Sequence, residues 1–138
     1  MTARKYGRAG LVALAIVAAA GPVLAGDVVQ QLQERYRNAG AGPFSAAAGE
    51  ELWRSGHVDP ETGDKRSCTT CHTSDLTRAG EHARTGKRIE PMAPSVNPKR
   101  LTEVREVRKW FLRNCKWTLG RECTAQEKGD LLAFLKGQ

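Results

Sequence analysis

Apolar residues recur every three or four positions in four stretches of the chain, which is the spacing of an amphipathic helix. The pattern predicts helices at residues 28–38, 46–53 and 102–113, and a last helix from residue 124 toward the end. After the first 25 residues, no segment alternates like a β-strand for more than four positions. We therefore predict an all-α fold in which helices are joined by long loops rich in glycine and proline.

The same pattern predicts where the helices begin and which residues face inward. Asp27 and Ser45 are expected to cap the first two helices, and Thr124 with Glu127 forms a capping box at the start of the last. The expected contact residues are Val28, Val29, Leu32 and Tyr36; Gly49, Leu52 and Trp53; Val104, Val107, Trp110 and Phe111; and Leu131, Leu132, Phe134 and Leu135.

The first 25 residues differ from the rest of the chain. Three basic residues precede an apolar run at residues 11–20, and small residues follow up to Ala25. This order is typical of a secretory signal peptide. The apolar run is too short to span a bilayer, which takes about 20 residues. We predict cleavage after Ala25 and export to the periplasm, with residues 26–138 as one domain.

The charge of the chain limits the kinds of partner it suits. The 138 residues carry a formal charge of +7, which falls to +4 when the leader with Arg4, Lys5 and Arg8 is removed. So small an excess argues against nucleic-acid binding and favours an acidic protein partner. A domain of this size can fold alone but buries only a modest core, which a large cofactor or a disulfide would stabilise.

The most specific motif is Cys68-x-x-Cys71-His72. Two thiols three positions apart on one turn of helix can reach the two vinyl groups along one edge of a porphyrin, and the next residue then lies under the ring as a ligand to iron. We predict one covalently attached haem c on Cys68 and Cys71, with His72 as the proximal ligand. Export agrees with this prediction, because c-type haem is attached after export.

Two other interpretations of paired cysteines are weaker here. A thioredoxin-like motif requires a βαβ context, and no strand-rich segment precedes Cys68. A structural zinc site requires a second ligand pair at short spacing, whereas Cys115 and Cys123 are eight positions apart.

The sixth iron ligand decides the function, and the residues leave several candidates open. Met92 offers a thioether, but it lies only 20 residues after His72, and a single methionine is more often packing than ligand. His57 and His82 stand in polar, loop-like sequence, where solvated histidines are common.

The residues resemble the class I cytochromes c, because a helix with Gly49 and Trp53 precedes the haem motif and a terminal helix carries Phe134. A closer resemblance is to the sphaeroides haem protein (SHP) family of small periplasmic monohaem cytochromes c. The segments that carry it are APSVNPKR at residues 93–100, WFLRNCK at 110–116 and GRECTAQEKGD at 120–130. The resemblance extends from about residue 46 to the end of the chain.

This resemblance implies a class I cytochrome c-like fold, with His72 as the proximal ligand, Asn114 as the distal ligand and a disulfide between Cys115 and Cys123. It also implies a protein that binds oxygen and that a dihaem or other c-type cytochrome reduces. Asn97 lies in a second recognisable motif, so the choice of Asn114 rests on its place next to Cys115.

The chemistry of Asn114 agrees with this role. The residue is expected to end the third helix, where asparagine is also common for structural reasons. Its amide oxygen is a hard donor that suits ferric iron better than ferrous iron. We therefore expect Asn114 to bind the oxidised haem and to leave on reduction, so that O2 or NO can bind. The alternative is a closed electron carrier with His72 and Met92 as ligands.

Two further expectations concern activity and docking. No His–Arg constellation specifies reductase or peroxidase chemistry, so a gas-binding electron-transfer protein is favoured over a dedicated enzyme. The third helix carries a basic face that is either a solvated surface or a docking patch for an acidic cytochrome; its residues are Arg105, Arg108, Lys109, Arg113 and Lys116.

Overall fold

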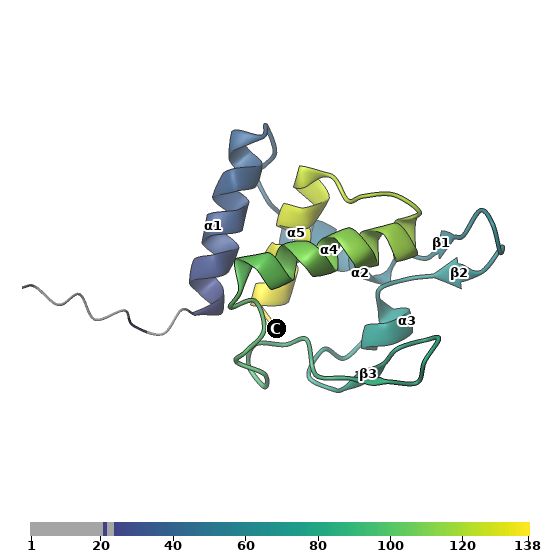
Figure 1. Ribbon diagram of the computed structural model, residues 1–138. Helices are drawn as coiled ribbons and strands as arrows, with labels where there is room; N and C mark the ends of the chain where they lie inside the picture. The colour runs from purple at the N-terminus through teal and green to yellow at the C-terminus, as the bar shows by residue number, and fades with distance from the viewer. Residues whose placement is uncertain (1–20, 22–23) are drawn as a thin grey trace, which may run out of the picture.

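The computed structural model describes residue 21 and residues 24–138, and this part of the chain is mostly helical (Figure 1). Its helices are α1 (Ala25–Asn38), α2 (Ala46–Arg54), α3 (Thr69–His72), α4 (Val104–Leu119) and α5 (Ala125–Lys136). Its strands are β1 (His57–Val58), β2 (Lys65–Arg66), β3 (Gly80–Glu81) and β4 (Arg88–Ile89), which pair antiparallel as β1–β2 and β3–β4.

These elements confirm the predicted all-α fold, because each strand is only two residues long. Within the described residues, no helix combines the length and the apolar character that crossing a membrane requires. Almost all of the predicted signal peptide lies outside the described residues, so its cleavage after Ala25 stays a prediction.

Helix α1 begins three residues earlier than the sequence predicts. Leu24 is the N-cap, and Asp27 lies in the first turn, where its carboxylate accepts a hydrogen bond from the Leu24 N–H at 3.2 Å. An acidic side chain stabilises a helix start from either position, which is why the pattern placed the cap at Asp27. The four predicted inward residues, Val28, Val29, Leu32 and Tyr36, are all buried.

Helices α2 and α5 cross at close range and form the centre of the fold (Figure 1). A Cβ on Gly49 would lie 2.1 Å from the backbone oxygen of Asp130, so only glycine permits this approach. Trp53 of α2 is buried, and its ring centroid lies 6.2 Å from that of Phe134 in α5. Ser45 caps α2, where its Oγ accepts the Ala48 N–H at 3.2 Å.

Helix α4 starts two residues later and ends six residues later than predicted. It stops at Gly120, which adopts a left-handed φ of 69°. No helix breaker lies between Arg113 and Gly120, and glycine takes this terminal conformation without strain. The prediction that Asn114 ends the helix is therefore wrong, because Asn114 lies within it.

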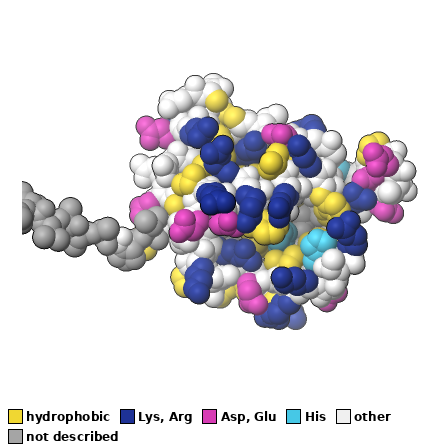
Figure 2. Space-filling model, viewed as in Figure 1, with side chains coloured by type: hydrophobic (Ala, Val, Ile, Leu, Met, Phe, Trp, Pro, Cys, Tyr) yellow, Lys and Arg dark blue, Asp and Glu magenta, His cyan; other side chains and the backbone are white. Residues whose placement is uncertain are grey.

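The prediction that Trp110 faces inward is also wrong. Trp110 is 47% exposed, whereas Val107 and Phe111 are partly buried against the core. In the longer helix, the inward face continues through the buried residues Cys115 and Thr118, so Trp110 lies on the outside. Lys and Arg side chains surround scattered apolar groups on the face that α4 crosses (Figure 2).

Helix α5 begins as predicted, directly after Thr124. The Thr124 Oγ1 accepts the Glu127 N–H at 3.1 Å, and the Glu127 carboxylate accepts the Thr124 N–H at 2.7 Å. This reciprocal pair confirms the capping box. The predicted apolar face is buried at all four positions, Leu131, Leu132, Phe134 and Leu135.

Candidate haem site

The predicted attachment motif forms one turn of helix. Cys68 is the N-cap of α3, and its carbonyl oxygen accepts the His72 N–H at 3.1 Å. Residues three apart in a helical turn lie on one side, so the thiols of Cys68 and Cys71 face the same region. Neither thiol joins a disulfide. The loop after β3 contacts this helical turn, because the Ala83 N–H donates to Cys71 Sγ at 3.4 Å.

His72 is positioned by an aromatic contact from the helix crossing. The ring centroids of Trp53 and His72 lie 5.4 Å apart, and Trp53 also contacts Phe134. The three rings connect α5 through α2 to α3. The close packing permitted by Gly49 therefore also fixes the imidazole.

The environment of His72 keeps its imidazole neutral. Burial lowers the pKa of His72 to about 4, and the positive charge of Arg100 adds to this effect. Arg100 is half-buried and held in place by the backbone, with its guanidinium donating to the carbonyls of Pro91 at 2.8 Å and Glu90 at 2.5 Å. A neutral imidazole is the form that binds iron.

Cys68 connects the motif to α4. Burial raises the pKa of Cys68 to about 11, and a side-chain interaction with Thr118 opposes this rise only in part. The hydroxyl of Thr118 therefore lies beside the thiol. Asn114 precedes Thr118 by four residues, so both lie on the inward face of α4. Asn114 is partly buried at this position.

The other candidate ligands make their own contacts within the chain. The Asn97 side-chain amide donates to the Pro91 carbonyl at 3.0 Å. His57 Nε2 pairs with Ser55 Oγ at 3.0 Å, and His82 Nδ1 accepts the Arg84 N–H at 3.3 Å. The Met92 backbone N–H bonds to the Leu76 carbonyl at 3.0 Å, and its side chain packs against the core.

The residues present fit a c-type haem. Two thiols on one helical turn and a neutral imidazole form the donor set for covalent attachment and axial ligation. His72 Nδ1 is buried and finds no hydrogen-bond partner among the described residues. Groups of three or more His, Cys, Asp or Glu that could hold a bare metal ion are absent from the described part of the chain.

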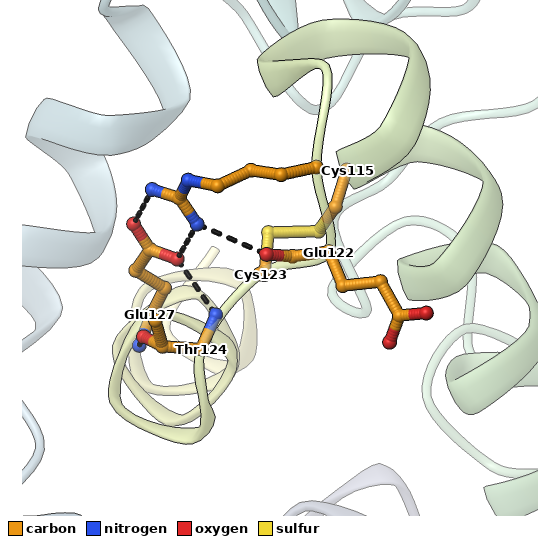
Figure 3. Close-up of a disulfide and its surroundings, with 6 residues drawn as sticks. Cys115, Glu122, Cys123, Thr124 and Glu127 are labelled. Atoms are coloured by element: carbon orange, nitrogen blue, oxygen red, sulfur yellow. Dashed lines mark hydrogen bonds and ion pairs between the residues drawn. A yellow bond between two sulfur atoms is a disulfide. The ribbon is translucent and has the colours of Figure 1, made fainter.

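The predicted disulfide between Cys115 and Cys123 is confirmed (Figure 3). It joins α4 to the segment before α5, with the two Cα atoms 5.5 Å apart. Residues 116–119 between the cysteines are helical, so only residues 120–122 form the loop that the disulfide closes. Nearby, the Arg121 guanidinium donates to both carboxylate oxygens of Glu127, at 2.7 and 2.8 Å (Figure 3).

Two residues of the site are missed by the sequence analysis. Thr118 would follow from the four-residue spacing to Asn114 once α4 is extended to Gly120. Arg100 has no such signal, because a folded loop rather than a helical period brings it near His72.

The helix crossing and the C-x-x-C-H turn define a class I c-type cytochrome, and comparison with known proteins agrees. A family model described as a domain of unknown function (DUF1924) matches residues 39–135. The cytochrome c-type protein SHP of Cereibacter sphaeroides is 48% identical over 120 residues, which cover 86% of this chain and 92% of that protein. The chain belongs to the SHP family of c-type cytochromes.

Solved structures support the same assignment. Oxidized SHP, described as an oxygen binding cytochrome c, superposes with a TM-score of 0.71 at 46% identity, over 80% of this chain and 96% of that one. Oxidized cytochrome c'' from Methylophilus methylotrophus superposes with a TM-score of 0.70 at 29% identity, over 80% and 94% of the two chains. A solution structure of cytochrome c'', with a TM-score of 0.67, is described as giving insights into haem-ligand detachment.

Proposed function

We propose that this protein is a periplasmic monohaem cytochrome c with a labile distal ligand. Cys68 and Cys71 would hold one haem c covalently, with His72 as the proximal ligand and Asn114 as the distal ligand. The protein would accept electrons from a redox partner, such as a dihaem or other c-type cytochrome. It would bind O2, NO or a similar small molecule in the reduced state.

The observation that carries this proposal is the position of Asn114. It lies on the inward face of α4, one turn before Thr118, whose side chain meets the haem-attaching Cys68. If this inward face borders a haem held by α3, Asn114 would reach the side of the haem away from His72. The side-chain NH2 of Asn97 donates to the Pro91 carbonyl, 3.0 Å away, and leaves its oxygen free, so Asn97 is the competing candidate that the test below must exclude.

The ligand chemistry explains how the site would open. A bound c-type haem supplies an iron that changes oxidation state and can take a small molecule in one axial position. The amide oxygen of Asn114 is a hard, neutral donor, so it would hold ferric iron better than ferrous iron and would leave a reduced haem. The freed side-chain NH2 can then donate a hydrogen bond to the small molecule.

Two relatives support a ligand-binding cytochrome rather than a closed electron carrier. SHP is described as oxygen binding, and haem-ligand detachment is described for cytochrome c''. The exported location rests on the predicted signal peptide, as does the oxidising compartment that suits the disulfide.

The test compares two asparagines and one methionine. Asn114→Ala should change the ferric absorption spectrum and raise the O2 dissociation rate about tenfold, the equivalent of one lost hydrogen bond. Asn97→Ala removes the same group elsewhere, and Met92→Leu conserves apolar volume; both should leave the ferric spectrum unchanged. Mass spectrometry of each denatured variant should show one attached haem.

The opposite pattern contradicts the proposal. If Met92→Leu alters the ferric spectrum and Asn114→Ala does not, the protein is a closed carrier with Met92 as its ligand. If acid–butanone extracts the haem, the proposed thioether links to Cys68 and Cys71 are wrong.

A further inference from the structure

The outward surface of α4 combines exposed aromatic rings with positive charge. Trp110, Leu112 and Trp117 are 47%, 43% and 37% exposed, although apolar residues of this size are usually covered. Trp110 and Trp117 are seven residues apart, so two turns of α4 bring them to the same side of the helix. We call the set of Arg105, Trp110, Leu112, Arg113, Lys116 and Trp117 the outer face of α4.

Cations lie against both tryptophan rings. Lys109 Nζ and Arg113 Cζ lie 5.2 and 5.6 Å from the centroid of the Trp110 ring. Arg66 Cζ lies 4.9 Å from the centroid of the Trp117 ring, so the β1–β2 hairpin holds the end of α4. These contacts order the rings before any partner arrives, which lowers the entropic cost of binding.

The charge of this face is only partly neutralised. Glu106 pairs with Lys109 at 2.5 Å, and Glu122 pairs with Lys116 at 3.5 Å. Within the described residues, no carboxylate lies within ion-pair distance of Arg105 or Arg113. Exposed tryptophan and arginine are the residues that contribute most to binding in protein interfaces.

We propose that the outer face of α4 is the docking surface for an acidic one-electron donor protein. This inference rests on the proposed function, because it concerns the route by which that haem is reduced. Asn114 follows Trp110 by four residues and precedes Trp117 by three, so it lies beside these rings and borders the outer face on its inward side. A docked partner would therefore meet the helix that carries the proposed distal ligand. The donor loses one electron and the ferric haem gains it, and no bond is formed between the proteins.

Charge complementarity favours an acidic protein as the occupant. Opposite charges on two proteins accelerate encounter, and the effect weakens when salt screens exposed charges over about 10 Å at 0.1 M. An anionic membrane is the competing occupant of a basic, tryptophan-bearing face. A membrane would not explain why the face lies on the helix that carries the proposed distal ligand.

The experiment measures anaerobic reduction of the ferric holoprotein in a stopped-flow instrument. The probe is flavodoxin hydroquinone, an acidic one-electron donor, and dithionite serves as a small reductant that needs no docking surface. Trp110→Ala and Arg113→Gln should each lower the bimolecular rate constant with flavodoxin by about three- to tenfold at low salt. Neither change should alter reduction by dithionite.

Two controls separate docking from general charge effects. Lys136→Gln removes an equal charge at the end of α5 and should leave the flavodoxin rate within about twofold of the wild type. The wild-type rate should fall steeply as salt rises, while that of Arg113→Gln falls less.

Several results would overturn the proposal. The proposal is wrong if the rate constant of the wild type with flavodoxin does not change with salt, or if flavodoxin does not reduce the protein at all. It is also wrong if Lys136→Gln lowers this rate constant as much as Arg113→Gln does. If the wild type binds vesicles of anionic phospholipid, and Trp110→Ala abolishes this binding without changing the rate constant with flavodoxin, the face binds a membrane instead. CO binding to the dithionite-reduced protein reports separately on Asn114, so failure of docking and failure of the proposed function are distinguishable.

Discussion

Trp53 takes part in both the helix crossing and the haem site. Its ring contacts Phe134 on one side and His72 on the other. The imidazole is therefore positioned by a buried side chain of the core, not only by its own short helix. Packing that is set by Gly49 at the centre of the fold thus reaches the proposed iron ligand.

Glu127 gives a prediction about acid stability at the residue scale. Its pKa is lowered to about 2, chiefly because Arg121 donates to its carboxylate. A lowered folded-state pKa stabilises the protein above the unfolded value near 4.5, and this contribution disappears as pH falls from there toward 2. Glu127→Gln should therefore lower the free energy of unfolding by about 1 kcal/mol at pH 7 and by less at pH 3.

Urea unfolding of the holoprotein at both pH values checks this prediction. Glu34→Gln on the exposed side of α1 is the matched control and should change stability little at either pH. A difference between wild type and Glu127→Gln that is the same at pH 7 and pH 3 would show that the ion pair does not stabilise the fold.

At the scale of elements, helix starts that are marked by a capping side chain could be predicted from the sequence. The end of α4, which no nearby residue marks clearly, could not. The capping box of Thr124 and the cap of Ser45 placed α5 and α2 correctly, because these side chains bond to their own first turns. The end of α4 was misplaced because asparagine is favoured at helix ends and disfavoured inside helices, so Asn114 was taken as the end. Only the packing of Cys115 and Thr118 decides between the two.

The residues of the proposed haem site also differ in how far the sequence predicts them. The C-x-x-C-H motif is local, so the residues of α3 could be predicted from their spacing. The choice of Asn114 needed a family resemblance, because no period in the sequence relates α4 to α3. Arg100 depends on a folded loop and carried no sequence signal.

The disulfide gives a prediction at the element scale. It closes a short loop between α4 and α5, and the chain-entropy model assigns roughly 2–3 kcal/mol to such a link. Replacing both Cys115 and Cys123 by Ala should therefore lower the free energy of unfolding by about that amount, as measured with urea. The ferric spectrum should also change, because Asn114 is the neighbour of Cys115.

A stability loss without a spectral change would indicate that the disulfide holds α4 but does not position Asn114. An unchanged urea midpoint would contradict the stabilising role of the link.

In the whole molecule, helix α4 carries residues of both proposed functions. Asn114 is partly buried on the inward side of α4, and the exposed Trp110 lies one turn before it on the same helix. The disulfide and the Arg66 contact with Trp117 both hold the C-terminal half of this helix. A small molecule and an electron donor would therefore both act at α4, on neighbouring sides of this helix.

The absorption spectrum of the reduced holoprotein, recorded before and after CO is added, tests the central claim most directly. If Asn114 leaves on reduction, the ferrous protein is high-spin and its spectrum shifts to that of a CO complex as soon as the gas is mixed in. A low-spin ferrous spectrum that CO does not change would contradict the claim, because it would show a sixth ligand that stays bound in both oxidation states.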